Sequence, residues 1–288
     1  MKYSVKFICR GVKVVFINMF ITIISVSAVI CSLATTQAEA NSIYFNNFND
    51  LQNNPVGNYW SASPGPVSID TVPKPNGNYM GGFLGQFTGN DSATLSLGGL
   101  STGWTTLSFD TYFIRSWDGA DTEFGPDYFK VNVVDGPVLL NETFSNGNPA
   151  GQSYSGNGVK SPYYPNPDNT SMTGSLQQYS LGYYFYDGLH GNTTQAMDSV
   201  YHFDLSFFNA SDSLQIQFAG VGLQDALVSV PDEYKITEDT GPYSYIDESW
   251  GIDNVRLDIA PVPEPSSLWL LSAGGIGLLA WRRRKQSK

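Results

Sequence analysis

Four carboxylates stand within ten positions of one another and are the residues best suited to binding a metal ion: Asp118, Asp121, Glu123 and Asp127. Calcium takes about six to eight oxygen ligands, mostly carboxylates and carbonyls on loops, so this stretch is a candidate Ca²⁺ site. The Asp-x-Asp-x-Asp-Gly pattern of an EF-hand loop is absent. The alternative is a solvated acidic loop whose aspartates make only turn hydrogen bonds.

Aromatic residues are abundant, and an exposed ring can stack on the apolar face of a sugar. The best candidates are Tyr163 and Tyr164, which prolines flank within a polar loop, and Trp117 is a further candidate. For any single ring, packing within the protein is the competing interpretation. These three residues form a predicted carbohydrate-binding site.

Signs of catalysis are scarce. The sequence has no Gly-x-Ser-x-Gly elbow, no His-Glu-x-x-His zinc motif and no phosphate-binding glycine loop. Of the two histidines, His190 and His202, the second lies in a strand-like run between aromatic residues, which favours a structural role. Carboxylate pairs of the kind that a glycosidase needs are Asp232 with Glu233 and Asp247 with Glu248. Such pairs arise without function in so acidic a chain, so we expect no enzyme.

The elements that must position these groups are β-strands. Between positions 41 and 260, runs with apolar residues at every second position are separated by Gly, Pro, Asn, Asp and Ser, which is typical of a β-sandwich. The expected strands are 42–48, 79–87, 92–97, 105–115, 127–134, 138–144, 179–186, 200–208, 214–220 and 250–259. Long loops are expected at 145–173 and 230–245.

This pattern predicts an all-β chain with a single domain, 41–260, folded as a jelly-roll-type β-sandwich. The first and last strands of a jelly roll commonly approach each other. We therefore expect Asp253, near the end of the domain, to join the carboxylates of the acidic loop.

The charge of the domain restricts its partners. Residues 41–263 contain six basic and 24 acidic residues, a net charge of −18. Nucleic acid is disfavoured as a partner because nothing would neutralise its phosphates. Neutral sugars and Ca²⁺ are compatible with this charge. Both cysteines, Cys9 and Cys31, precede the domain, which excludes from it a disulfide, a thiolate metal site and a cysteine nucleophile.

Residues 1–40 have the pattern of a secretory signal peptide. Basic residues precede a mostly apolar stretch, 14–33, and a small-residue site with Ala38 and Ala40 predicts cleavage after Ala40. An uncleaved anchor is the alternative. A lipoprotein at Cys31 is disfavoured because Ile30 is not a small residue. Export through Sec-type machinery is the expectation.

Residues 261–288 have the pattern of a second targeting segment. Pro263, Glu264 and Pro265 precede an apolar run, 266–281, and a basic cluster follows: Arg282, Arg283, Arg284 and Lys285. As a transmembrane helix this run would be roughly 24 Å long, short for a hydrocarbon core of about 30 Å. The basic cluster should stay cytoplasmic and leave the domain outside. The alternative is a plain C-terminal anchor with an incidental Pro-Glu-Pro.

The ordered combination of Pro-Glu-Pro, apolar run and basic cluster closely resembles the PEP-CTERM sorting domain. The resemblance implies recognition of Pro263, Glu264 and Pro265 by an exosortase, a protease- or transpeptidase-like membrane enzyme of exopolysaccharide-producing Gram-negative bacteria. It implies a protein held transiently in the inner membrane and then delivered to the cell surface or released.

Stretches within 79–259, above all Asp247-Glu248-Ser249-Trp250-Gly251-Ile252-Asp253-Asn254-Val255, resemble lectin-like or carbohydrate-binding jelly rolls. This resemblance implies a fold rather than an activity. The expected function is a non-catalytic, exopolysaccharide-associated protein of the envelope or biofilm matrix that requires no cofactor, apart from the candidate calcium. A purely structural matrix protein and, third, a glycoside hydrolase or lyase are the alternatives.

Overall fold

The computed structural model describes residues 40–49, 56–73, 81–156, 169–188, 193–231 and 244–261. They belong to one compact unit, Ala40–Val262. Within the described ranges the regular structure is β-strand, apart from a single 3-10 turn, η1 (Val56–Asn58). The all-β prediction is confirmed.

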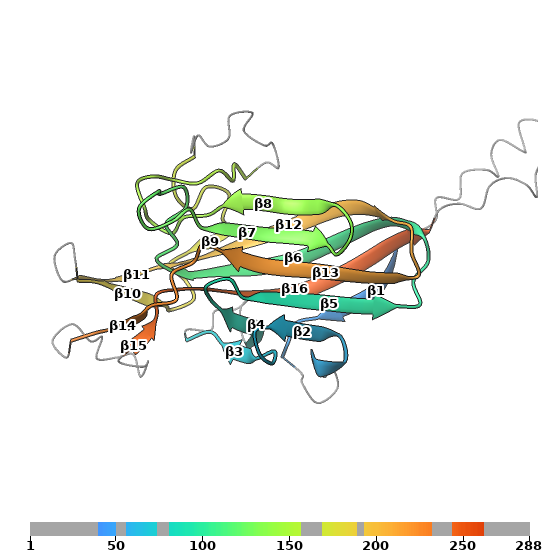
Figure 1. Cartoon of the computed structure of the whole chain (residues 1–288), viewed down its shortest axis with the longest axis horizontal. Coiled ribbons are helices and arrows are strands. Elements are labelled where there is room, and N and C mark those ends of the chain that lie inside the picture. Colours follow the sequence, from blue (N-terminus) through green and yellow to red (C-terminus); the bar gives the residue numbers. More distant parts are fainter. Residues whose placement is uncertain are drawn as a thin grey trace, which may run out of the picture. The chain divides into compact units, whose positions relative to one another are not determined.

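Two antiparallel sheets make up the layers of a β-sandwich (Figure 1). The seven-stranded sheet has the order β3 (Ile69–Thr71), β4 (Gly82–Phe87), β16 (Glu248–Pro261), β6 (Gly103–Arg115), β12 (Asp198–Asn209) and β9 (Gln177–Gln178), and β1 (Asn41–Asn46) also pairs with β16. The five-stranded sheet has the order β2 (Trp60–Ser63), β5 (Ser92–Gly98), β13 (Ser213–Val221), β7 (Tyr128–Val133) and β8 (Val138–Thr143).

The chain passes repeatedly from one sheet to the other, as in a jelly roll. It runs from β5 to β6, from β6 to β7, and later from β12 to β13 and back to β16. Two small ribbons, β10 (Tyr184–Asp187) with β11 (Thr193–Ala196) and β14 (Leu227–Ser229) with β15 (Ser244–Ile246), gather at one end of the sandwich (Figure 1). The predicted fold class, a jelly-roll-type β-sandwich, is confirmed.

The long strands form where the sequence alternates. In β6, Leu107, Phe109 and Phe113 point into the space between the sheets and are fully buried. The opposite face of β6 carries Trp104 and Ser108, because successive side chains of a strand point to opposite faces. The core between the sheets is strongly aromatic, and Phe113 packs against four aromatic rings, those of Trp117, Phe129, Phe144 and Tyr201.

One expected strand is largely replaced by another kind of structure. A strand was expected at 179–186, but β10 begins only at Tyr184. The buried carboxylate of Asp198 accepts hydrogen bonds from the backbone N–H groups of Ser180 and Leu181 at 2.7 and 3.0 Å. The Asp198 side chain therefore accepts hydrogen bonds from backbone N–H groups that would otherwise pair with a neighbouring strand.

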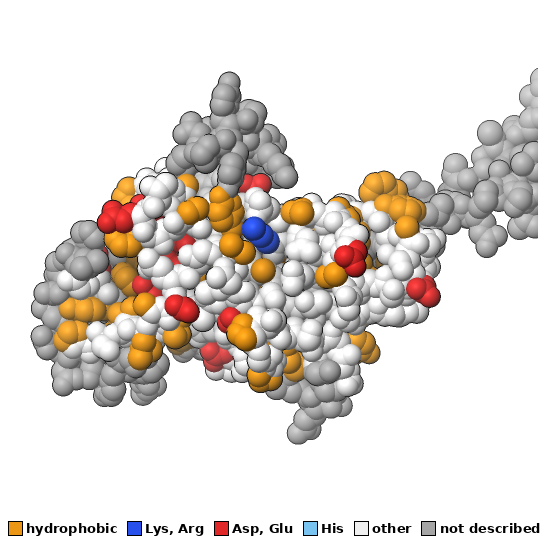
Figure 2. Space-filling view, viewed as in Figure 1, with side chains coloured by type: hydrophobic (Ala, Val, Ile, Leu, Met, Phe, Trp, Pro, Cys, Tyr) orange, Lys and Arg blue, Asp and Glu red, His pale blue; other side chains and the backbone are white. Residues whose placement is uncertain are grey.

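A second, smaller core lies on the outer face of the seven-stranded sheet. It contains Val72, Phe83, Tyr112, Ile114, Leu181, Tyr183 and Val200. This cluster covers only the half of the sheet near the ribbons, where β6 ends and β12 begins. The other half of the same face stays open to solvent. On the side of the molecule in Figure 2, acidic side chains are scattered rather than gathered into one patch.

Truncating the centre of the aromatic core should be costly. We expect Phe113→Ala to lower the free energy of unfolding by about 3–5 kcal/mol, because the change removes buried contacts and leaves a cavity. Leu176→Ala, at a side chain that is 59% exposed, should change it by less than about 0.5 kcal/mol. Urea unfolding followed by tryptophan fluorescence measures both. Equal losses in the two variants would contradict this account of the core.

Candidate functional site

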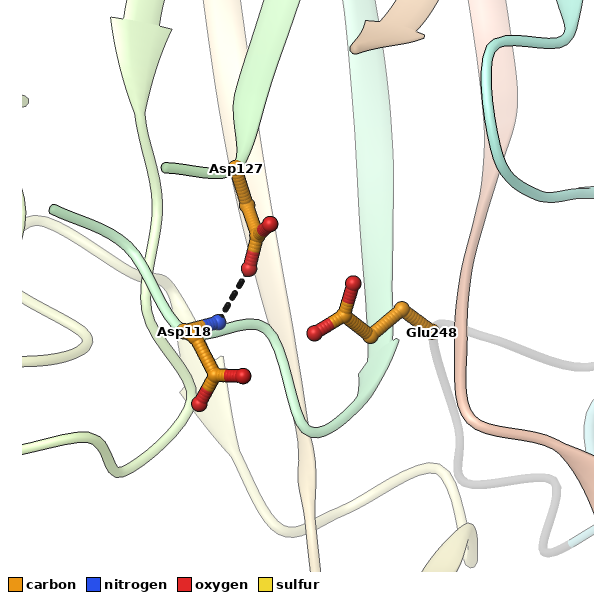
Figure 3. Close-up of side chains that lie close together, drawn as sticks. All are labelled: Asp118, Asp127 and Glu248. Carbon is orange, nitrogen blue, oxygen red and sulfur yellow. Dashed lines mark hydrogen bonds between the residues drawn. The ribbon is translucent and has the colours of Figure 1, made fainter. Parts of the chain in front are cut away.

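Three carboxylates from three segments meet at the ribbon end of the sandwich (Figure 3). Asp118 follows β6, Asp127 directly precedes β7, and Glu248 is the first residue of β16. An oxygen of each carboxylate lies within 4.8 Å of the others. Asp127 and Glu248 are fully buried, whereas Asp118 is partly exposed. The group joins both sheets, since β7 belongs to one and β6 and β16 to the other.

The loop between β6 and β7 is folded back on itself at this point. The Asp127 N–H donates to the carbonyl of Gly119 at 2.8 Å, and the Asp118 N–H donates to the Asp127 carboxylate. Gly119 has a φ of +67°, and a Cβ there would lie 2.0 Å from the carbonyl oxygen of Gly151. Only glycine fits this turn, which brings Asp118 and Asp127 together.

Burial makes ionisation of the cluster unfavourable. Burial raises the pKa of Glu248, and the negative charge of Asp127 raises it further. Burial likewise raises the pKa values of Asp127 and Asp118. Within the described residues, none of the three carboxylates forms an ion pair with a lysine or arginine. No basic side chain in the described part of the chain therefore pairs with the cluster.

Two further predicted calcium ligands lie on the outer side of the same loop. The Asn148 amide connects Asp118 and Asp121, donating to Oδ1 of the first at 3.0 Å and to Oδ2 of the second at 3.2 Å. The other oxygen of Asp121 accepts the N–H groups of Glu123 and Phe124, and these bonds lower the pKa of Asp121. The Glu123 side chain is exposed and is not part of the three-carboxylate group.

Asp253 does not join the cluster, which corrects our expectation. It lies five positions beyond Glu248 along β16, roughly 17 Å at the usual rise of a strand. It also points to the outer face of the sheet, where its carboxylate accepts the Tyr112 hydroxyl at 2.9 Å. The start of the last strand, rather than its middle, approaches the acidic loop.

The sequence interpretation missed Glu248 as a member of this group. The alternation along the strand could have identified it. Glu248, Trp250 and Ile252 stand at every second position and therefore point to the same face, and Trp250 and Ile252 are fully buried. Asp127 has the same relation to Phe129 and Val131. Each of the two strands thus begins with a carboxylate on the face that its apolar residues bury. This pattern in the sequence predicts a buried acidic pair.

A cavity of about 490 Å³ opens beside the cluster. Asp118, Asp121 and Asn148 line it from the acidic loop, and Phe124 and Phe185 add aromatic surface. Asp127 and Glu248 do not line it, so Asp118 is the member of the cluster that faces the cavity. The cavity therefore gives small solutes and water access to the edge of the cluster.

The predicted sugar-stacking residues are differently placed. Trp117 is fully buried, packs against Phe113, and donates its indole N–H to the carbonyl of Ser249 at 2.8 Å. Stacking a sugar on its face would require the ring to leave the core. Tyr163 and Tyr164 lie outside the described residues.

Exposed aromatic side chains occur instead on the open half of the outer face of the seven-stranded sheet. Trp104 on β6 is 62% exposed and Phe208 on β12 is 49% exposed. The two residues are directly paired across the strands, and their ring centroids lie 5.8 Å apart in an edge-to-face arrangement. Neither ring was singled out from the sequence, because exposure within a strand depends on which half of a face is covered.

Polar side chains continue this surface along the same strands. His202 Nδ1 lies 2.7 Å from Asp110 Oδ1, and the Asn254 amide donates to the other oxygen of Asp110 at 2.8 Å. Between these groups and the aromatic pair lie Ser108, which donates to Asp204, and Thr106, 3.3 Å from Ser206. We name the set Trp104, Thr106, Ser108, Asp204, Ser206 and Phe208 the open face.

The two processing segments lie almost entirely outside the described residues. The predicted cleavage point after Ala40 falls directly before β1, and the first sorting residue, Pro263, comes two positions after the end of β16. The predicted transmembrane helix, 266–281, and the basic cluster lie outside the description. Among the residues that are described, none forms a helix with the length and apolar character needed to cross a bilayer.

Comparison with known families confirms the resemblance of the tail. The PEP-CTERM protein-sorting motif matches residues 261–285. The motif implies an exported protein of a Gram-negative-type envelope that is sorted by an exosortase and is transiently anchored in the membrane. No curated protein matches the chain.

Three solved structures that resemble the domain do so distantly. The K3 cleaved adhesin domain of Lys-gingipain from Porphyromonas gingivalis is 12% identical, with 75% of this chain and 98% of that chain covered and a TM-score of 0.35. The Agl-KA catalytic domain is 10% identical, covering 81% and 31%, with a TM-score of 0.32. A carbohydrate-binding module that recognises mannan is 13% identical, covering 77% and 99%, with a TM-score of 0.33. TM-scores this low establish neither a shared fold nor a shared function.

Asp253 should make stability depend on pH. Burial, with a smaller contribution from the charge of Asp110, raises the pKa of Asp253 to about 7, despite the hydrogen bonds from Tyr112 and Asn254. Between about pH 4 and pH 7 the folded state then holds a proton that the unfolded chain has lost, so stability falls as pH rises. Between pH 4 and pH 8 the free energy of unfolding of Asp253→Asn should therefore rise, relative to wild type, by on the order of 4 kcal/mol.

Urea unfolding at pH 4, 6 and 8 measures this effect. Asp212→Asn, in the exposed turn between β12 and β13, is the matched control and should differ from wild type by a constant amount. A difference between Asp253→Asn and wild type that does not change with pH would contradict the assignment.

Proposed function

We propose that this protein is an exosortase-processed component of the cell envelope or extracellular matrix whose β-sandwich binds neutral carbohydrate without catalysis. The sorting motif at residues 261–285 supports the exported location. The observation that carries the binding function is the open face, where an exposed aromatic pair adjoins a row of hydroxyl and carboxylate groups.

The chemistry of the open face suits a sugar. Trp104 and Phe208 offer ring faces to the C–H groups of a pyranose, while Ser108, Asp204 and Ser206 offer acceptors and donors to its hydroxyls. The residues are held on two long neighbouring strands, so their spacing is fixed before a ligand binds.

The charge of the domain selects among polysaccharides. With a net charge of −18 over residues 41–263, an acidic polysaccharide would be repelled. A neutral or weakly charged glycan meets no such barrier. The proposed ligand is therefore a neutral segment of an exopolysaccharide.

The arrangement of carboxylates supports a binding role over a glycosidase. Asp247 accepts a hydrogen bond from Ser116, whereas the neighbouring Glu248 is fully buried beside Asp127. A general acid and its partner must both reach the glycosidic bond. The pair Asp232 and Glu233 lies outside the described residues.

Removing either ring of the aromatic pair should weaken glycan binding. We expect Trp104→Ala and Phe208→Ala each to weaken binding about tenfold, because a stacking contact contributes on the order of 1 kcal/mol beyond its buried area. Isothermal titration calorimetry with neutral oligosaccharides chosen by glycan array gives the affinities. Phe124→Ala, an exposed ring at the opposite end of the domain, is the control and should bind like wild type.

Two results would count against this site. Unchanged affinity in the double variant Trp104→Ala/Phe208→Ala would show that sugar binds elsewhere. Absence of binding across a panel of neutral glycans would favour the purely structural matrix protein.

Changing the sorting motif should block processing. We expect Glu264→Ala to leave the basic residues Arg282–Lys285 on the mature protein, because the exosortase would no longer recognise its substrate. Mass spectrometry of the C-terminus, in a host that carries the exosortase, reads this directly. Ser287→Ala, outside the motif, should be processed normally. Finding the intact tail on all wild-type protein would leave the plain-anchor alternative.

A further inference from the structure

The three-carboxylate group of Asp118, Asp127 and Glu248 differs from an ordinary acidic surface in its burial. Two of its members are fully buried, and they come from opposite sheets. Placing ionised carboxylates side by side away from water is strongly unfavourable unless they take up a proton or a positive charge accompanies them. Folding nevertheless brings them within 4.8 Å.

A second observation points to a ligand. In each buried carboxylate one oxygen is held by the backbone: the Asp118 N–H donates to Asp127 Oδ2, and the Gln224 N–H donates to Glu248 Oε2. The other oxygens, Asp127 Oδ1 and Glu248 Oε1, are buried and have no hydrogen-bond partner among the described residues. In Figure 3 the Glu248 carboxylate points toward the space beside Asp118 and Asp127.

The donor set indicates which ion fits. Three carboxylates, with no histidine or thiolate among them, are hard oxygen donors, which suit Ca²⁺ or Mg²⁺ rather than a softer transition metal. Calcium tolerates irregular geometry and mixed protein and water ligands, whereas magnesium needs a near-ideal octahedron. The adjoining cavity reaches the cluster at Asp118 and supplies a route for the ion and its water ligands.

We propose that Asp118, Asp127 and Glu248 bind one Ca²⁺ ion, which ties the start of β16 to the loop between β6 and β7. The ion neutralises most of the cluster's charge and occupies the two unpartnered oxygens. It joins the two sheets at the end where the ribbons lie. The proposal does not depend on glycan binding, which lies on the open face.

The experiment uses the full-length chain in mild detergent, freed of metal with EDTA and titrated with CaCl₂ by calorimetry and thermal unfolding. We expect one site per chain and a melting temperature about 5–10 °C higher at a Ca²⁺ concentration about 100-fold above the Kd. Glu248→Gln and Asp127→Asn should each lower the Ca²⁺ affinity at least tenfold.

The same variants distinguish a lost ligand from a damaged fold. Because an amide removes like-charge repulsion, Glu248→Gln should melt at or above the wild-type temperature in EDTA and below it in saturating CaCl₂. Glu123→Gln is the matched control, an exposed acid of the same loop, and should keep the wild-type affinity and Ca²⁺-dependent shift.

Three results would overturn the proposal. These are wild-type protein without a heat of binding or a melting shift in CaCl₂, a Glu248→Gln variant with wild-type affinity, and an equal response to MgCl₂ at the same concentrations. Loss of glycan binding in Trp104→Ala with an unchanged Ca²⁺ response would support the calcium site. The calcium proposal and the carbohydrate proposal can therefore be refuted independently.

Discussion

Antiparallel pairing of β6 with β16 governs where everything else in this domain can lie. The two strands are the longest among the described residues, and their register runs from Glu248 opposite Arg115 to Pro261 opposite Gly103. One end of this pair holds Glu248 near Asp118 and the other end exposes Trp104 beside Ala260. Trp104 and Arg115 are eleven positions apart on one strand, roughly 36 Å. The two proposed sites are therefore separated by most of the length of the sandwich.

A β-bulge divides this strand pair. The register shifts between Asp253 and Arg256, and Asn254 adopts a positive φ of 51° there. Asparagine tolerates this conformation better than most residues. The irregular segment keeps Ile252, Val255 and Leu257 in the core while Asp253 and Asn254 reach Tyr112 and Asp110 on the outer face. Polar groups thus concentrate where the second core of that face gives way to the open face.

The alternation of apolar and polar residues in the sequence predicted much of the fold, but only part of the three-carboxylate site. Residues 105–115 and 127–134 alternate clearly, so β6 and β7 were predictable, as was the proximity of Asp118 and Asp127 across their connecting loop. Short strands such as β3 and the β14–β15 ribbon have too few residues to show a period. Trp117 was expected at a surface, but its indole N–H finds the Ser249 carbonyl, a partner 132 positions away that the local sequence does not indicate. Glu248 lies in the site because of the register in which β16 pairs with β6. That register likewise depends on residues that are far apart in the sequence.

The position of β16 in its sheet also has a mechanical consequence. The strand is hydrogen-bonded to β6 along one side and to β1 and β4 along the other, and it continues without interruption into the sorting segment. Hydrogen bonds between antiparallel strands lie perpendicular to the strands. A pull on the tail therefore loads many of these bonds at once in shear instead of opening them one after another. The sorting segment is thus attached to the domain through a strand that is hydrogen-bonded along both of its sides.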